Sequence, residues 1–165
     1  MKKILVSACL LGEAVRYDGR DKALDDRLLR QLLREDRVIG FCPEVGGGLP
    51  IPRPAAEIQN GGGAAVIAGH ARVLTDSGDD VTDYFLAGAR QALELCQEHE
   101  IRAAVLTESS PSCGGTQIYD GSFSRRAIAG AGVTAALLRS RNIAVFNQHQ
   151  LRAAVEYLDS AGARD

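Results

Sequence analysis

The stretch Lys3-Ile4-Leu5-Val6-Ser7-Ala8-Cys9-Leu10-Leu11-Gly12 decides the fold of this chain. Residues 3–8 form a short, mostly apolar run that passes directly into loop residues, as is typical of a buried strand. The same arrangement recurs twice, because residues 38–41 lead into Cys42 and residues 101–106 lead into the loop that contains Cys113. The sequence therefore predicts three buried strands, each followed by a cysteine in its loop.

Segments with helical spacing separate these strands. Leucines recur at helical spacing over residues 23–35, with acidic residues near the start and Arg34 near the end, as the helix dipole favours. A second amphipathic helix is expected over residues 80–98, with Asp79 or Asp80 as its N-cap.

The C-terminal part continues the alternation of helices and strands. We expect a helix at residues 132–141, a strand at 143–146 and a helix at 148–158, where Asn147 and Gln150 resemble a capping box. Strands that alternate with helices indicate an α/β fold. The predicted architecture has three layers around a mostly parallel, Rossmann-like sheet.

Three segments interrupt this pattern. Residues 64–67 and 71–74, separated by a turn at 68–70, predict a small β-hairpin inserted in the fold. Residues 43–54 are rich in glycine and proline and cannot be regular for long. Residues 108–130 are expected to be irregular.

Length, composition and charge limit the classes of protein. The chain has 165 residues, 45% of them hydrophobic, which fits a single domain of residues 1–165 with its own core. The net charge is −2 and the basic residues are scattered, so nucleic acid is not an expected partner. No apolar run approaches the roughly 20 residues of a membrane span, and the N-terminal run is too short for a signal peptide. We expect a cytoplasmic protein without a membrane partner.

The four cysteines fall into two groups. Cys96 lies on the apolar face of a predicted helix and is expected to be an ordinary core residue. Cys9, Cys42 and Cys113 follow strands, and the carboxyl ends of parallel strands meet at one edge of a sheet, where ligands bind. Disulfides are disfavoured in the cytosol and no Cys-x-x-Cys pair is present, so metal binding or catalysis is one interpretation of these three. The other is that they are small buried side chains.

An iron–sulfur cluster is the metal group that fits three such cysteines. Thiolate is the ligand that these clusters select, and the small residues beside each cysteine let a bulky cluster approach the backbone. A cluster of four irons on three cysteines leaves one iron without a protein ligand, as an open Lewis acid. The count of three therefore indicates a catalytic rather than a structural role.

Polar side chains near these cysteines are further candidates. Glu44 is a general acid or base, or else a carboxylate that satisfies loop amides. Ser110 holds a polar group of a substrate, or else caps its own loop. Tyr17 and Tyr119 each begin a Tyr-Asp-Gly triplet, which favours a turn, with lining of the pocket as the alternative.

Two features suggest anion binding only weakly. Arg53 can bind an anionic group or form an ion pair with Glu57. The glycine run at residues 46–48 lacks the Gly-Lys-Ser/Thr ending of a phosphate loop, so we do not expect it to bind phosphate.

At these residues the chain resembles a bacterial family, the thiouracil desulfidases. The similarity covers essentially the whole chain. The matching stretches are 7–12 (Ser-Ala-Cys-Leu-Leu-Gly), 16–19 (Arg-Tyr-Asp-Gly), 42–45 (Cys-Pro-Glu-Val), 47–49 (Gly-Gly-Leu), 52–54 (Pro-Arg-Pro), 56–58 (Ala-Glu-Ile), 110–114 (Ser-Pro-Ser-Cys-Gly), 118–121 (Ile-Tyr-Asp-Gly) and 132–135 (Gly-Val-Thr-Ala).

The resemblance implies a 4Fe-4S cluster on Cys9, Cys42 and Cys113 with one open iron. It implies removal of sulfur from 2- or 4-thiouracil to give uracil and sulfide without net redox change. Glu44 would be the acid or base, and Ser110 would assist substrate binding or proton transfer. The candidates for substrate binding are Ser112, Tyr17 and Tyr119.

The chain also departs from the family. Thr107 stands where the family often has lysine, and Ala55 where it often has proline, which affects the expected substrate preference. Longer relatives that resemble desulfidases of transfer RNA carry a further domain, and this chain stops at Asp165. A small thiolated pyrimidine is therefore the expected partner. The rival hypotheses are a non-enzymatic iron–sulfur redox or iron sensor and a zinc-dependent hydrolase on the same three cysteines.

Overall fold

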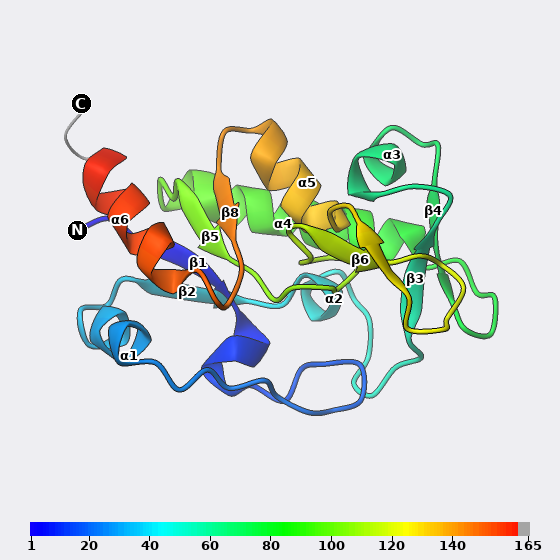
Figure 1. Ribbon diagram of the computed structural model, residues 1–165, viewed down its shortest axis with the longest axis horizontal. Helices are drawn as coiled ribbons and strands as arrows, with labels where there is room; N and C mark the ends of the chain where they lie inside the picture. Colours follow the sequence, from blue (N-terminus) through cyan, green and yellow to red (C-terminus); the bar gives the residue numbers. More distant parts are fainter. Residues whose placement is uncertain (162–165) are drawn as a thin grey trace.

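The computed structural model of the protein describes residues 1–161. Its centre is a sheet of four parallel strands in the order β2-β1-β5-β8 (Figure 1). These strands are β1 (Ile4–Ser7), β2 (Val38–Phe41), β5 (Ala103–Val105) and β8 (Ala144–Phe146). Each overlaps a strand that the sequence predicted, so the expectation of an α/β fold with a mostly parallel central sheet is confirmed.

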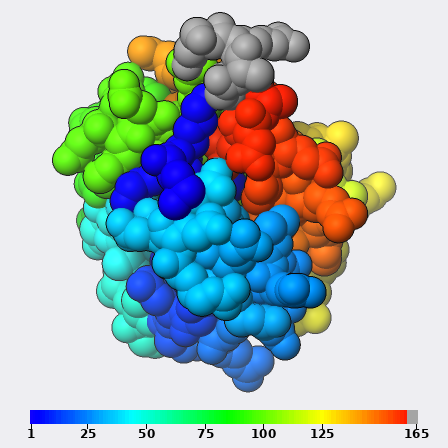
Figure 2. All heavy atoms as spheres, turned by 90° about the vertical axis from the view of Figure 1, so that its left-hand side faces the viewer, coloured from blue at the N-terminus to red at the C-terminus, as the bar shows by residue number. Residues whose placement is uncertain are grey.

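Helices cover both faces of the sheet, because successive side chains of a strand point to opposite faces. The helices are α1 (Arg27–Arg34), α4 (Thr82–Glu98), α5 (Val133–Ser140) and α6 (Leu151–Ala161). On β1, Ile4 and Val6 pack with α1 and α6, whereas Leu5 packs with α4 and α5. Figure 2 views the end of the molecule where the first residues (dark blue) lie beside α6 (orange to red).

A side-chain cap decides where α1 begins, and a related pair of hydrogen bonds precedes α6. The Asp26 carboxylate accepts hydrogen bonds from the amides two and three residues later, so α1 starts at residue 27 rather than 23. Before α6, Gln150 accepts from the Asn147 amide, but the Asn147 side chain accepts from the amide of His149. Half of the predicted capping box therefore forms. No helix in residues 1–161 is both long and apolar enough to cross a membrane.

The prediction of the hairpin was wrong for its first strand, residues 64–67. An antiparallel pair is present, but β4 (Arg72–Thr75) pairs with β3 (Ala56–Gln59), and residues 64–67 belong to the helix α3 (Gly63–Ile67). Helix α3 packs closely on the start of α5, since a Cβ atom at Gly63 would lie 2.2 Å from the carbonyl oxygen of Gly132. A run of four apolar residues does not distinguish a strand from a buried helix, and this long-range contact decides between them.

Short elements also form in residues 43–54, which were expected not to be regular for long, and in residues 108–130, which were expected to be irregular. Residues 43–54 begin with a single helical turn, α2 (Pro43–Gly46). Residues 108–130 contain an antiparallel pair, β6 (Gln117–Tyr119) and β7 (Ala127–Ala129), so the prediction of a wholly irregular segment was wrong. With the 3₁₀ turn η1 (Ala8–Leu11), which directly follows β1, these elements surround the carboxyl edge of the sheet.

Candidate active site

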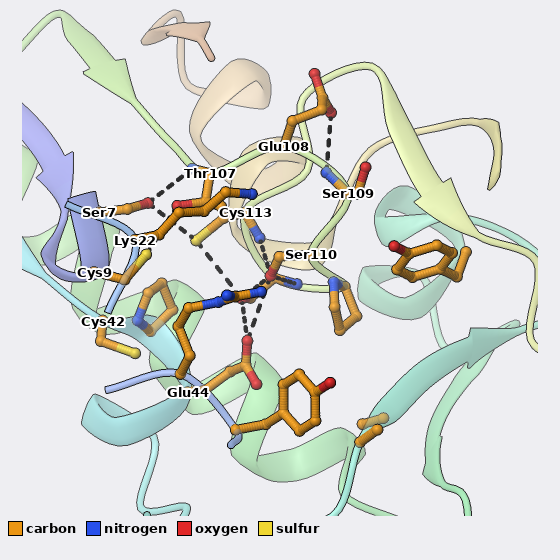
Figure 3. Close-up of a pocket in the computed structure, with 18 of the residues that line it drawn as sticks. Ser7, Cys9, Lys22, Cys42, Glu44, Thr107, Glu108, Ser109, Ser110 and Cys113 are labelled. Carbon is orange, nitrogen blue, oxygen red and sulfur yellow. Dashed lines mark hydrogen bonds between the residues drawn. The ribbon is translucent and has the colours of Figure 1, made fainter. Parts of the chain in front are cut away.

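Cys9, Cys42 and Cys113 line one cavity of about 890 Å³ at the carboxyl edge of the sheet. Cys9 lies in η1, directly after β1, and Cys42 is the N-cap of α2, directly after β2. Cys113 lies in the loop after β5, and all three are free thiols. Figure 3 shows the three side chains around a common space, with Glu44 and Ser110 beside them. The structure thus brings together the three cysteines that the strand pattern predicted to converge.

Hydroxyl groups lie beside two of the three cysteine sulfurs. The Ser7 hydroxyl donates to Cys113 Sγ at 3.5 Å, and the Ser112 hydroxyl lies 3.6 Å from the same sulfur. Cys9 Sγ lies 3.0 Å from the hydroxyl of Thr107. Hydrogen bonds of this kind orient and stabilise sulfur ligands of a metal group.

Burial keeps two of these thiols protonated. It raises the pKa of Cys113 to about 12, and the nearby Cys42 and Glu44 add to this effect. It also raises the pKa of Cys42, against the opposing influence of the Val45 amide. A metal group that binds here must therefore displace protons.

The arrangement fits a cluster better than a single ion. Zinc holds thiolates at about 2.3 Å, which gathers the sulfurs around one point. Within residues 1–161, no group of three or more His, Cys, Asp or Glu side chains is arranged to hold one metal ion. Three thiols on separate elements around an open cavity, with hydroxyl donors beside them, match instead the donor set of an iron–sulfur cluster. Metal analysis of protein purified without oxygen tests the zinc hydrolase hypothesis, because iron and acid-labile sulfide would then be absent.

A hydrogen-bonded group of polar side chains lies next to the cysteines. Glu44 Oε2 accepts from the Ser112 hydroxyl at 2.8 Å and from the Ser110 hydroxyl at 3.4 Å, and the two hydroxyls are 2.9 Å apart. Glu44 Oε1 accepts from Arg53 Nε at 3.2 Å. Both carboxylate oxygens therefore have hydrogen-bond partners, and Figure 3 shows Glu44 beside Ser110.

The Arg53 contact corrects a prediction from the sequence. Arg53 pairs with Glu44 and not with Glu57, although Glu57 is closer along the chain. Glu57 instead accepts hydrogen bonds from the amides of Gly121 and Phe123. Both carboxylates line the cavity. Because Glu57 is hydrogen-bonded to amides of the turn after β6, Glu44 is the carboxylate that pairs with Arg53.

The predicted substrate-binding residues lie at the cavity in different ways. Tyr17 and Tyr119 both line it, and Tyr17 is largely exposed. The Asp-Gly turns after them also form, since Asp18 and Asp120 each accept from the amide two residues later. Ser112 is only 1% exposed. Its buried hydroxyl hydrogen-bonds to Glu44 and Ser110, which favours a role in positioning these two side chains over direct contact with a ligand.

Close packing places the turn that carries Cys42 and Glu44. A Cβ atom at Gly88 of α4 would lie 1.8 Å from the Pro43 carbonyl oxygen, and one at Gly47 would lie 2.1 Å from that of Tyr84. Only glycine allows α2 to approach α4 this closely. The glycine run therefore has a packing role here.

Glu108 organises the loop of Cys113, although the sequence pattern did not single it out. Its carboxylate accepts from the amides of Ser109, Gly115, Thr116 and Gln117, and from the side chains of Thr116 and Asn147. Burial acts to raise the pKa of Glu108, but these hydrogen bonds lower it to about 2. A lone glutamate after a strand carries no distinctive pattern. Lys22, which also lines the cavity (Figure 3), was missed for the same reason.

The chain is similar to known proteins along most of its length. A family described as 2-thiouracil desulfurase matches residues 4–150. The uncharacterized protein YbbK of Bacillus subtilis (strain 168) is 43% identical over 148 residues, which are 90% of this chain and 97% of that protein. The solved structure of the [4Fe-4S]-dependent thiouracil desulfidase TudS is similar with a TM-score of 0.88 and 48% identity, over 96% of this chain and 99% of that one.

Proposed function

This chain belongs to the 2-thiouracil desulfurase family, and from that premise we propose that it removes sulfur from thiouracil-type pyrimidines with a 4Fe-4S cluster. The products are uracil and sulfide, with no net redox change. The observation that carries the proposal is the single cavity in which three free thiols lie beside the hydrogen-bonded group of Glu44, Ser110 and Ser112.

Cys9, Cys42 and Cys113 hold the cluster in this proposal, and one iron stays without a protein ligand. When bound, the cluster supplies a Lewis-acidic iron with affinity for sulfur. The Ser7, Ser112 and Thr107 hydroxyls hydrogen-bond to the ligand sulfurs. At Cys113, the hydrogen bonds from Ser7 and Ser112 lower the pKa and so act against the burial that raises it.

The protein's own part in the chemistry is to move protons. Replacing the thione sulfur by the oxygen of water moves both protons of the water to the departing sulfur, which leaves as hydrogen sulfide, while no electrons are transferred. Glu44 Oε2 is the proton acceptor, since it is a carboxylate oxygen beside the cavity. The hydroxyls of Ser110 and Ser112, each within hydrogen-bond distance of that oxygen, pass the proton from Glu44 to the departing sulfur.

The remaining polar and aromatic residues bind the substrate. Tyr17 and Tyr119 present rings at the cavity wall that suit a flat pyrimidine, and Ser112 supports Ser110. We also propose that residues 1–165 act as one domain and that its sheet is Rossmann-like, because the first strand is central and the chain order reverses beside it.

Anaerobic reconstitution tests the proposal. We expect the loaded protein to contain iron and acid-labile sulfide, and to release one sulfide for each uracil formed from 2- or 4-thiouracil without an added oxidant or reductant. Glu44→Gln should keep the iron and lose at least about 100-fold in turnover. A fully loaded protein that is inert towards thiolated pyrimidine bases and nucleosides would overturn the proposal and favour the iron–sulfur sensor.

A further inference from the structure

Arg53 is a buried cation that contacts three separate segments of the chain. Its side chain is 4% exposed. Nε donates to Glu44 Oε1 at 3.2 Å, Nη1 to the Pro50 carbonyl at 3.2 Å and Nη2 to the Val15 carbonyl at 3.0 Å. Each nitrogen of the guanidinium group thus has its own acceptor.

These acceptors connect two of the loops that carry cysteines. Val15 lies in the loop after Cys9, and its carbonyl oxygen is also 4.0 Å from Cys42 Sγ. The Arg53 amide donates to the Tyr17 carbonyl in the same loop, at 2.8 Å. Arg53 therefore fixes the loop after β1 relative to the turn of Cys42 and Glu44.

The geometry requires arginine rather than any cation. The planar guanidinium group presents donors in fixed directions, whereas a lysine ammonium is a compact point charge that cannot reach three separated acceptors at once. With Glu44 Oε1 taken by Arg53, the other oxygen faces Ser112 and Ser110. The orientation of the Glu44 carboxylate is set because Arg53 binds one oxygen and the two serines bind the other.

We infer that Arg53 is a positioning residue for the desulfuration, which acts through Glu44 by holding Oε1 so that Oε2 faces the two serine hydroxyls. The inference rests on the proposed function and assigns to Arg53 a role in turnover in addition to its role in the fold. Because misplacing a reacting group by about 1 Å can cost on the order of 100-fold in rate, the effect of Arg53 should be measurable in kcat.

The test is a double-mutant cycle on reconstituted protein with Arg53→Lys, Glu44→Gln and the double variant. We expect Arg53→Lys to lower kcat about 10- to 100-fold per loaded cluster, with iron content, sulfide content and the dissociation constant of uracil unchanged. In the Glu44→Gln background, Arg53→Lys should have no further effect on kcat. The matched control is Arg72→Lys, in the exposed ion pair with Asp80, which should change nothing.

The outcomes distinguish a failure of the proposed desulfuration from a failure of the proposed role of Arg53. An inert wild-type protein with a full cluster contradicts the proposed function itself. An active wild type with additive effects of Arg53→Lys and Glu44→Gln, or with unchanged kcat in Arg53→Lys, overturns the role of Arg53. If Arg53→Lys does not fold, Arg53→Gln replaces it, and failure of both to fold with a full cluster makes Arg53 a structural residue and the inference wrong.

Discussion

The loop that carries Cys113 and the turn that carries Cys42 meet at one cavity, but different kinds of interaction hold them. The Cys113 loop is fixed from within, because the Glu108 carboxylate binds four amides between residues 109 and 117. The start of α5 adds to this, since the Thr134 amide donates to the Ser112 carbonyl. Most of these partners lie within ten residues of Glu108.

The Cys42 turn is fixed from outside. It has one helical turn of its own, and its place depends on the close approach to Gly88 of α4 and on the ion pair of Glu44 with Arg53. Cys42 is also less buried than Cys113. The difference indicates that one half of the site is organised locally and the other half by long-range packing, which the following experiments test in order of expected effect.

Removing the cysteines should have the largest effect. Cys113→Ala and Cys42→Ala should each abolish cluster loading and lower activity at least about 1000-fold, because the metal group supplies several kcal/mol of the catalysis. Iron content and thiouracil turnover measure this. Cys96→Ala, which removes a buried thiol from α4, should lower the melting temperature and leave iron content unchanged. Normal loading of Cys42→Ala would show that only two of these cysteines are needed.

Gly88→Ala should disturb the Cys42 turn without touching the Cys113 loop. The new methyl group would lie 1.8 Å from the Pro43 carbonyl oxygen, so α2 must move away from α4. We expect a loss of about 1–3 kcal/mol in the free energy of unfolding, together with reduced iron content. Denaturant titration and iron analysis measure both. Arg90→Ala, on the exposed side of the same helix, is the control, and equal behaviour of the two variants would contradict long-range positioning.

Glu108→Gln should weaken the Cys113 loop in a pH-dependent way. Folding lowers the pKa of Glu108 from 4.5 to about 2, so its contribution is complete above pH 4.5 and is lost as the pH falls towards about 2. We expect the variant to lose about 1–2 kcal/mol at pH 7 after solvent screening is taken into account. Unfolding of the metal-free chain at pH 7 and pH 3 measures this. A difference from wild type that stays constant with pH would exclude the charge as its cause.

Thr107→Val should have the smallest effect. It removes the hydroxyl 3.0 Å from Cys9 Sγ, and loss of a hydrogen bond to a sulfur ligand should make the cluster's reduction potential more negative. Protein-film voltammetry of the loaded protein measures the shift. The control is Thr134→Val, because the buried Thr134 hydroxyl has no hydrogen-bond partner within residues 1–161 and its removal should be neutral or stabilising. Equal shifts in both variants would contradict a specific role of Thr107.

The sequence by itself determined the frame of the site. An apolar run followed by a cysteine, repeated three times, predicts strands whose ends meet at one edge, and β1, β2 and β5 do so. The helical spacing around Cys96 likewise placed that residue in the core. These predictions succeed because periodicity is a local property, and parallel strands leave little choice about which ends lie together.

Only the tertiary structure decided which side chains are paired within that frame. The contact of Arg53 with Glu44, the approach of Gly88 to Pro43 and the formation of α3 instead of a strand at residues 64–67 all depend on segments far apart in the chain. Even the amides that Glu108 binds reach its carboxylate only because the loop folds around that carboxylate. Such contacts depend on the distance between atoms in the folded chain, and no spacing along the sequence specifies that distance.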